Sequence, residues 1–228
     1  MNLQHWADAL KTHWGINADL RRLDGEYDLN FRANTADGSA YIFKAMRPGC
    51  KAELVEMQVQ AFQHIAETAP DLPCPRVIAT SAGSAMLSIA DETGSERLCW
   101  MLECLPGRCY AECAPKTLQL IHEVGAVLGG AGKALADFQH PGLTRDFKWD
   151  LMQAGWIGSE LASITDPVRQ SLIRQIDTEF AKLEPVLQAL PKQAIHNDAN
   201  DYNIMVAGEL TEPRRVSGLI DPGDMCAA

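Results

Sequence analysis

The sequence predicts an α+β fold with two lobes, an antiparallel-sheet N-lobe and a mainly helical C-lobe. The 228 residues are 46% apolar and 22% charged, which is typical of a globular chain with a sizeable core. Strand-like segments surround one helical segment before residue 105, and helical spacing then dominates to about residue 193. We therefore expect an N-lobe at 1–104 and a C-lobe at 105–228.

The N-lobe is predicted to start with a hairpin. Leu29, Phe31 and Ala33 alternate with polar residues, as in a half-buried strand, and the Asp37-Gly38 pair favours a turn before a second strand at 41–46. Apolar residues at helical spacing predict a helix, which the following prolines end, and two further strands come after it. These three elements are expected at 51–67, 85–90 and 98–105.

The C-lobe is predicted to contain two long helices and then short strands. The first helix is expected to cover 117–138. The residues of its apolar stripe are Leu118, Ile121, Val124, Leu128, Leu135 and Phe138. Its glycines, which would allow close helix contact, are Gly125, Gly129, Gly130 and Gly132. Asp166-Pro167 has the pattern of an N-cap followed by a first-turn proline, and it opens a helix that kinks or ends near Pro185. The strands are expected at 194–195, 203–206 and 216–220, with the turn Glu212-Pro213 between the last two.

Composition narrows the choice of partner. There are 20 Lys and Arg against 30 Asp and Glu, and the resulting net charge of −10 argues against nucleic acid and favours a cationic small molecule. The longest charge-free run, 77–90, is too short for a membrane span, and the N-terminus lacks the pattern of a signal peptide. Seven cysteines without a CxxC pair indicate reduced thiols, so we expect a cytoplasmic protein without a zinc site.

The residues that carry chemistry are concentrated near the C-terminus. Asp198 and Asn203 bracket a tight polar loop that opens at His196, and Asp221 follows a neighbouring short apolar run. One carboxylate could orient a hydroxyl group, while an Asn and an Asp could bind Mg²⁺ through oxygen. A metal-dependent hydrolase built on His196, Asp198 and Asp221 is a weaker alternative, because such sites usually recruit more histidines.

Lys44 is a cation in the middle of a predicted strand. Because Ile42 and Met46 lie on the same face, burying the ammonium group requires an anion, and a nucleotide phosphate would supply one. A lysine that protects a sheet edge is the alternative interpretation. The turn at 23–30 lies where a loop could fold over phosphates, although it has one glycine only and is a weak signal by itself.

Together these motifs resemble a known family. HxDxxxxN at 196–203, IDxGD at 220–224 and the strand lysine are similar to the aminoglycoside/choline phosphotransferase branch of the protein-kinase-like fold. Within it, the chain looks most like the hydroxylysine kinase group and the kinase-like domain fused to class III aminotransferases. The resemblance covers roughly residues 18 to 225.

The resemblance implies a role for individual residues. Asp198 would be the catalytic base that orients the substrate hydroxyl, and Asn203 and Asp221 would bind Mg²⁺. Lys44 would hold the α- and β-phosphates of the nucleotide, and His196 would stabilise the catalytic loop.

Other implied contacts concern the nucleotide, ATP or GTP. Gln58 would support the strand lysine, with Glu56 as the alternative. The purine would bond to the backbone of Glu103 and Leu105. A turn would cover the triphosphate, and its residues are Glu26, Tyr27, Asp28 and Leu29.

The implied activity is that of a small-molecule kinase, with 5-hydroxylysine as the preferred acceptor. Aminoglycoside kinases, choline or ethanolamine kinases and a non-catalytic nucleotide-binding remnant are the alternatives. The chain departs from the family pattern at Asn197, where glycine is common, and at Pro222, where an aromatic residue is usual. Relatives continue into further C-lobe helices, so we expect a truncated C-lobe that belongs to a longer or fused chain.

Overall fold

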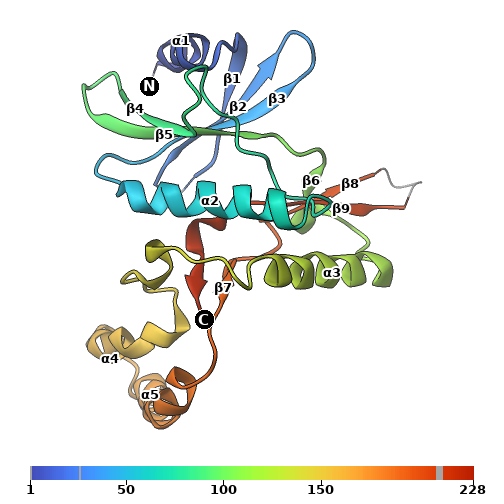
Figure 1. Cartoon of the computed structure of the whole chain (residues 1–228). Helices are drawn as coiled ribbons and strands as arrows, with labels where there is room; N and C mark the ends of the chain where they lie inside the picture. Colours follow the sequence, from blue (N-terminus) through green and yellow to red (C-terminus); the bar gives the residue numbers. More distant parts are fainter. Residues whose placement is uncertain (1, 26, 209–212) are drawn as a thin grey trace.

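The two lobes are evident in the computed structural model, which describes residues 2–25, 27–208 and 213–228 (Figure 1). An antiparallel sheet forms the N-lobe, and helices with two small sheets form the C-lobe. The predicted α+β fold is confirmed. The predicted boundary at 104/105 falls in the connection between the last strand of the large sheet, which ends at Glu103, and the next strand, which begins at Arg108.

The N-lobe sheet has the order β1-β2-β3-β5-β4, and all neighbours are antiparallel. The strands are β1 Ala18–Leu23, β2 Leu29–Thr35, β3 Ala40–Ala45, β4 Met86–Ala90 and β5 Glu96–Glu103. Side chains alternate between the two faces of the sheet, as the period of an extended strand requires. In β5, Cys99 and Met101 therefore face one side while Trp100 and Leu102 face the other.

Helix α1 (Leu3–Trp14) covers the first face. Its Trp6, Leu10 and Trp14 are buried against Phe31 and Phe43 of the sheet. The helix begins at the N-cap Asn2, whose side chain accepts a hydrogen bond from the backbone of Gln4, and it ends at Gly15 in the left-handed conformation.

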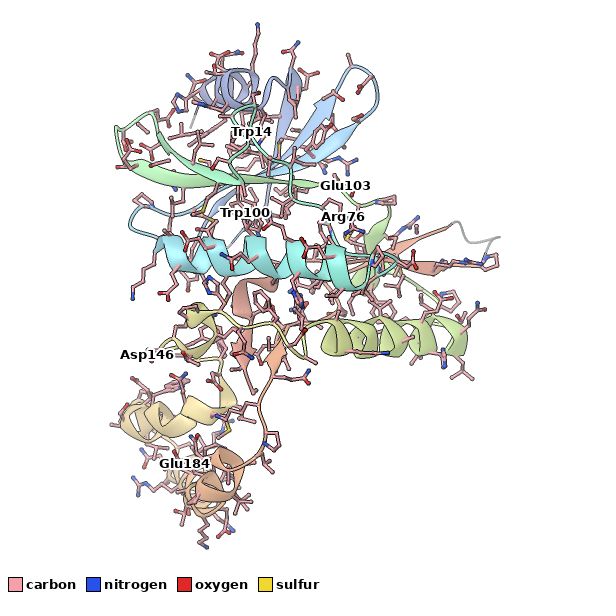
Figure 2. The ribbon with its side chains drawn as sticks, viewed as in Figure 1. Trp14, Arg76, Trp100, Glu103, Asp146 and Glu184 are labelled. Carbon is pink, nitrogen blue, oxygen red and sulfur yellow. The ribbon has the colours of Figure 1, made fainter. Side chains whose placement is uncertain are left out.

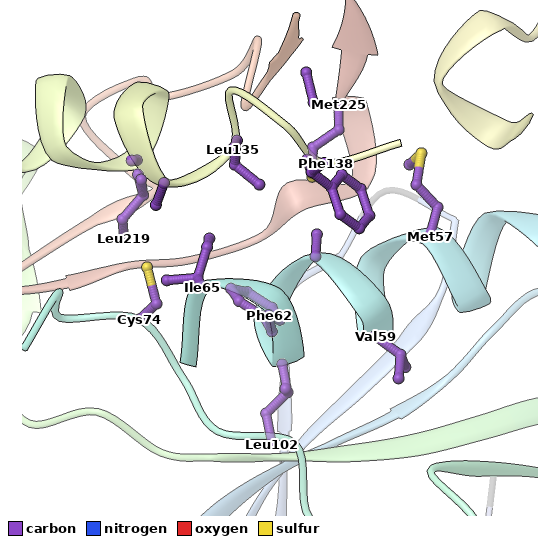
Figure 3. Packing of buried hydrophobic residues seen from close by; sticks show 14 of the residues in the cluster. Met57, Val59, Phe62, Ile65, Cys74, Leu102, Leu135, Phe138, Leu219 and Met225 are labelled. Atoms are coloured by element: carbon purple, nitrogen blue, oxygen red, sulfur yellow. The ribbon is translucent and has the colours of Figure 1, made fainter. Parts of the chain in front are cut away.

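Helix α2 (Ala52–Thr68) covers the second face and also contacts the C-lobe (Figures 1 and 3). Phe62 and Ile65 belong to one buried cluster with Leu102 of the sheet and with Leu135 and Met225 of the C-lobe. The apolar packing of the two lobes is therefore continuous through α2.

The C-lobe helices are α3 Leu118–Ala134, the short α4 Ile157–Glu160 and α5 Pro167–Gln188. Asp166 caps α5 as predicted, since its carboxylate accepts hydrogen bonds from the backbone of Val168 and Arg169. Pro185 lies inside α5 rather than ending it. Short 3₁₀ segments fill the path between α3 and α5, and they are Pro141–Thr144, Leu151–Trp156 and Leu161–Ser163.

Two small sheets enclose the loops that carry the sequence motifs. Strands β6 (Arg108–Cys109), β8 (Ile204–Ala207) and β9 (Arg215–Leu219) form one sheet, and β7 (Ala194–Ile195) pairs with β10 (Cys226–Ala227) in the other. The loop after β7 and the loop after β9 thus each connect a strand of one small sheet to a strand of the other.

Several expectations need correction. Helix α1 and strand β1 were not predicted, and α3 ends at Ala134, before the expected end at residue 138. Leu118 and Ile121 are exposed, whereas Leu135 and Phe138 of the same expected stripe are buried. Among the glycines expected to allow close contact, a Cβ atom on Gly125 or Gly129 would meet nothing within 4 Å in the described part of the chain. A Cβ on Gly130 would lie 2.8 Å from Leu72 Cδ1, so a close approach is present there.

The predicted turn at Glu212-Pro213 lies partly outside the described residues, because Glu212 is not among them.

Among the described residues, no helix combines the length and apolar character that a membrane span requires.

Candidate functional site

Lys44 of β3 forms an ion pair with Asp221 from the other lobe. Its Nζ donates to the Asp221 Oδ1 at 2.9 Å, and the lysine side chain is 10% exposed while that of the aspartate is 48% exposed. Lys44 lies opposite Asn30 and Trp100 in the sheet register, and its Nζ lies 5.5 Å from the centre of the Trp100 ring. The strand lysine is therefore turned toward the space between the lobes, not out from a sheet edge.

Asp221 itself has a left-handed backbone conformation, with φ of 60° and ψ of 72°. This region is uncommon outside glycine, although Asp and Asn tolerate it best. The Lys44 ammonium group beside it lowers the pKa of the Asp221 carboxyl below its ordinary value, and partial burial opposes that shift. The carboxylate is thus present as an anion across the neutral pH range.

The loop after β7 holds Asp198 through its two amide neighbours. Asn200 Nδ2 donates to the Asp198 Oδ1 at 2.8 Å, and Asn203 Nδ2 donates to Oδ2 at 2.9 Å and to the Asp198 carbonyl at 2.8 Å. Asn197, at the position where the family resemblance led us to expect a glycine, has a φ of 65°. Asparagine is one of the few residues that accept this conformation, which explains why the substitution fits.

This loop is connected directly to the Asp221 loop. The backbone N–H of Ile220 donates to the carbonyl of Asn203 at 2.9 Å, and His196 Nε2 bonds to the carbonyl of Ile220 at 2.9 Å. Because a carbonyl oxygen can only accept, His196 carries its proton on Nε2. Burial lowers the pKa of His196, which favours the neutral ring, and this ring connects the two loops through its hydrogen bond to Ile220. Its role in stabilising a catalytic loop stays a prediction.

A cavity of about 620 Å³ lies between the lobes and brings several of the predicted residues together, although its described lining does not include Asn203 or His196. The β1–β2 turn, the end of β3 and the start of α2 form its upper wall. The segment 142–149, Asp198 and the loop at 221–224 form its lower wall. Among the sequence candidates, the lining includes Tyr27, Asp28, Lys44, Gln58, Asp198 and Asp221.

The turn expected to cover phosphates is fixed by short contacts. Asp28 Oδ1 accepts a hydrogen bond of 2.6 Å from the backbone of Arg47, and the Arg47 guanidinium lies 5.5 Å from the ring centre of Tyr27. A Cβ at Gly25 would lie 2.5 Å from the Asn30 side-chain nitrogen and 3.0 Å from the Asp28 carbonyl oxygen, so a residue larger than glycine would require the Asn30 side chain to move. Leu29 begins β2 and packs beside the α1 cluster, whereas Glu26 lies outside the described residues.

Glu103, one of the two residues expected to contact the purine, is the last residue of β5, at one end of the sheet (Figure 2). The backbone N–H of Glu103 donates to the carbonyl of Arg76 at 2.9 Å, so this N–H already has a partner. The described lining of the 620 Å³ cavity does not include Glu103 or Leu105. Their contact with a purine stays a prediction.

Gln58 lies on α2 and is 1% exposed. Its Nε2 donates to the carbonyl of Leu54 at 3.1 Å, while the Lys44 ammonium group donates to Asp221 instead. Gln58 faces the cavity next to Gly223, because a Cβ on that glycine would lie 3.8 Å from Gln58 Oε1. Direct support of Lys44 by Gln58 therefore stays a prediction.

The chemistry of the oxygen donors fits Mg²⁺. A group of three or more His, Cys, Asp and Glu side chains arranged for a metal is absent from the described part of the chain. Because Asn203 Nδ2 is bound to Asp198, the Asn203 amide oxygen is left for another ligand, and Asp221 adds a carboxylate. Mg²⁺ takes few protein oxygens and completes its shell with water and phosphate, so this small donor set suits it.

Sequence reasoning missed one segment of the site, 142–149. The Asn197 side chain donates to the carbonyl of Trp149 at 3.2 Å, and the Trp149 side chain is largely exposed at the cavity. Asp146 lines the same cavity (Figure 2). Arg145 donates hydrogen bonds into the Asp221 loop from this segment. Their spacing in the sequence carries no recognisable motif, and only the folded chain brings them to the cavity.

A comparison with protein families gives one match over most of the chain. The model described as "Phosphotransferase enzyme family" matches residues 19–228. Among curated proteins, the chain is 30% identical to the hydroxylysine kinase of Mus musculus over 231 residues, which cover 90% of this chain and 60% of that protein. It is 25% identical to the hydroxylysine kinase of Danio rerio over 239 residues, which cover 98% of this chain and 66% of that protein. The chain thus spans less than two thirds of either relative.

Solved structures share the fold. An amicoumacin kinase in complex with AMP-PNP, Ca²⁺ and Ami matches with a TM-score of 0.73 and 16% identity, covering 100% of this chain and 66% of that chain. A microcompartment-associated aminopropanol kinase matches with a TM-score of 0.73 and 17% identity, and the match covers 97% of this chain and 70% of that chain. The GDP complex of an aminoglycoside 2'-phosphotransferase-IIIa matches with a TM-score of 0.71 and 13% identity, and the match covers 100% of this chain and 75% of that chain.

Proposed function

The chain belongs to the phosphotransferase enzyme family, and we propose that it transfers the γ-phosphoryl group of a nucleoside triphosphate to a hydroxyl group of a small cationic amino alcohol. One observation carries this proposal. The Lys44–Asp221 ion pair of 2.9 Å and the Asp198 carboxylate line the same cavity, although they come from three separate parts of the chain. A cation for phosphates and a carboxylate for a hydroxyl group are the two protein contributions that phosphoryl transfer requires.

The proposed reaction assigns one task to each side chain. Asp198 accepts a hydrogen bond from the acceptor hydroxyl and takes its proton as the new oxygen–phosphorus bond forms. The bond between the γ-phosphorus and its bridging oxygen breaks, and the nucleoside diphosphate leaves with the electron pair. Lys44 binds the phosphates of the donor. Its ammonium group then shares its hydrogen bonds between these phosphates and the Asp221 carboxylate.

Asn203 and Asp221 would hold Mg²⁺, which supplies positive charge against the phosphate oxygens when bound. Asn200 and Asn203 fix the Asp198 carboxylate through both of its oxygens, so this residue needs little rearrangement to receive the acceptor. The donor is ATP or GTP, since the proposed purine contacts with Glu103 and Leu105 use the backbone.

We propose 5-hydroxylysine as the first acceptor to test. The two curated relatives are hydroxylysine kinases, and one structural neighbour is an aminopropanol kinase. The net charge of −10 and the exposed carboxylates of Asp24 and Asp146 at the cavity suit a cationic amine. Aminoglycosides and choline or ethanolamine are the alternative acceptors, and nucleic acids and membranes are not proposed as partners. We place the activity in the cytoplasm, because the seven cysteines are free thiols.

Turnover by the purified chain tests this function. The chain is incubated with Mg²⁺, ATP or GTP, and each acceptor in turn, and release of ADP or GDP is measured. We expect turnover with 5-hydroxylysine and a loss of at least about 10²-fold in Asp198→Asn. Asp201→Asn is the matched control, because Asp201 lies on the same loop and its carboxylate faces Lys116 at 3.7 Å instead.

Two results would contradict the proposal. Full turnover in Asp198→Asn would show that Asp198 is not the base. Thermal stabilisation by Mg²⁺ and nucleotide without turnover of any acceptor would favour the alternative, a nucleotide-binding chain without catalysis.

A further inference from the structure

Arg145 lies in the segment between α3 and α4 and reaches three backbone carbonyl groups. Its Nη1 donates to Gly142 at 2.9 Å and to Met225 at 2.6 Å, and its Nη2 donates to Gly223 at 2.9 Å. The guanidinium lies 4.1 Å from the ring centre of Phe147. Two of the three carbonyls therefore belong to the loop that begins at Asp221, which is far from Arg145 in the sequence.

The Asp221 loop needs such support for a physical reason. Asp221 has a left-handed backbone conformation, which persists only where surrounding contacts determine it. Met225 is 1% exposed, and a buried carbonyl without a hydrogen-bond partner is unfavourable. A planar guanidinium presents several donors in fixed directions, so one arginine can serve the Gly223 and Met225 carbonyls at once, which a lysine cannot do with the same geometry.

Arg145 is itself fixed in place. Gln153 Nε2 donates to the Arg145 carbonyl at 2.9 Å, and Gln153 Oε1 accepts a hydrogen bond from the backbone of Phe147 at 3.1 Å. The same segment accepts the Asn197 side chain at the carbonyl of Trp149. One segment thus contacts both functional loops, the Asp198 loop through Trp149 and the Asp221 loop through Arg145.

Arg145 also faces the N-lobe. Its Nη1 lies 3.9 Å from the sulfur of Met57 on α2, and α2 carries Gln58 next to Gly223. The guanidinium therefore occupies the point where α2, the 142–149 segment and the Asp221 loop meet.

We propose that Arg145 is a positioning residue that holds the Asp221 loop, through the carbonyls of Gly223 and Met225, in the conformation that presents the Asp221 carboxylate to Lys44 and to the divalent metal. The metal part of this inference rests on the proposed function. The loop-holding part does not, because it concerns contacts within the chain alone.

The test compares Arg145→Lys and Arg145→Met with the matched control Arg214→Lys. Arg214 also donates to two carbonyl groups, those of Ala114 and Pro115, but at a distant site. The first measurement is amide hydrogen exchange of the metal-free chain over residues 220–227. We expect faster exchange there in both Arg145 variants, without a change in α1 or the N-lobe sheet, and no change in Arg214→Lys.

The second measurement is calorimetric binding of AMP-PNP over a range of Mg²⁺ concentrations. In Arg145→Lys, we expect the Mg²⁺ concentration for half-maximal tight binding to rise about 10- to 100-fold. Binding of the nucleotide in the absence of metal should change less than about twofold, since Arg145 donates to carbonyls rather than to the nucleotide. If the substitution instead disrupted the structure of the site in general, nucleotide binding with Mg²⁺ and nucleotide binding without metal would both weaken.

The outcomes separate the two parts of the inference. Unchanged exchange over 220–227 in a folded Arg145→Lys would overturn the loop-holding role, as would faster exchange spread over the whole chain. Unchanged Mg²⁺ dependence in Arg145→Lys would overturn the metal part. If the unsubstituted chain showed no metal-dependent nucleotide binding, the proposed function and the metal part would fall together, while hydrogen exchange would still decide whether Arg145 holds the loop.

Discussion

Two of the long helices, α2 and α5, differ in what they contribute to the molecule. The 17-residue α2 packs against the sheet on one side and the C-lobe on the other, and its buried residues are Val55, Met57, Gln58, Val59, Ala61, Phe62 and Ile65. None of the 22 residues of α5, all of which the structure describes, is buried. Length and helical pattern therefore do not indicate how much a helix stabilises the fold.

The difference also concerns the functional site. Helix α2 presents Gln58 and the start of its first turn to the cavity, and it supports the Asp221 loop through packing against Met225. Helix α5 contributes no residue to the described cavity lining. Substitutions in α2 should thus change stability and activity, whereas those in α5 should change neither strongly.

The largest effect is expected for Phe62→Ala in α2. Phe62 is 3% exposed in the cluster that joins both lobes, and its truncation leaves a cavity that the surrounding residues cannot fill. We expect the free energy of unfolding to fall by about 3–5 kcal/mol, measured by urea titration. A loss below about 1 kcal/mol would mean that α2 does not join the two lobes in the manner described.

A smaller effect, on turnover, is expected for Gln58→Met. The substitution conserves volume, so the free energy of unfolding should fall by less than about 1.5 kcal/mol. If Gln58 supports Lys44 once the phosphates are bound, kcat should fall about tenfold. Gln60→Met is the matched control, because Gln60 is exposed on the same helix. Equal turnover in the two variants would assign Gln58 to packing alone.

The Lys44–Asp221 pair connects the sheet to the C-lobe and predicts a pH dependence of stability. Lys44 lowers the pKa of Asp221 in the folded chain, so the unfolded chain binds this proton more readily. The stabilisation is complete above the ordinary aspartate pKa of about 4, and it is lost as pH falls from there through the lowered folded value.

Asp221→Asn isolates this contribution. Asparagine accepts the left-handed conformation but carries no charge. At pH 7 we expect the variant to be less stable by about 1 kcal/mol or less, because the Asp221 side chain is 48% exposed. Urea titrations at several pH values should show that this difference shrinks below about pH 4. A difference that stays constant from pH 7 to pH 3 would contradict the assignment to the ion pair.

Elements whose apolar residues recur at a regular period were predictable from the sequence. The alternation of Leu29, Phe31 and Ala33 and the helical spacing in 51–67 reflect which residues must be buried, and both elements form close to the expected positions. In α3 the same reasoning was wrong for Leu118 and Ile121, which are exposed. An apolar stripe shows that a helix is amphipathic, but it does not show that anything in the described chain covers that stripe.

The candidate site was predictable only where motif spacing carries information. Asp198 and Asp221 follow short apolar runs that become strands, Asn203 directly precedes another strand, and the structure brings the two loops together. Arg145 has no such pattern, because its partners are backbone carbonyls and any sequence supplies those. Long-range contacts of this kind depend on the folded chain, so a single sequence gives no signal for them.

The smallest effect is expected on the exposed face of α5, where Leu172 is 58% exposed and Ile176 is 59% exposed. Leu172→Ala removes little buried surface and replaces leucine with the best helix former, so the free energy of unfolding should change by less than about 0.5 kcal/mol. Urea titration at two protein concentrations measures it. A loss above about 2 kcal/mol that grew with protein concentration would show that another copy of the chain covers this face, and the contrast with α2 would then hold only for the isolated chain.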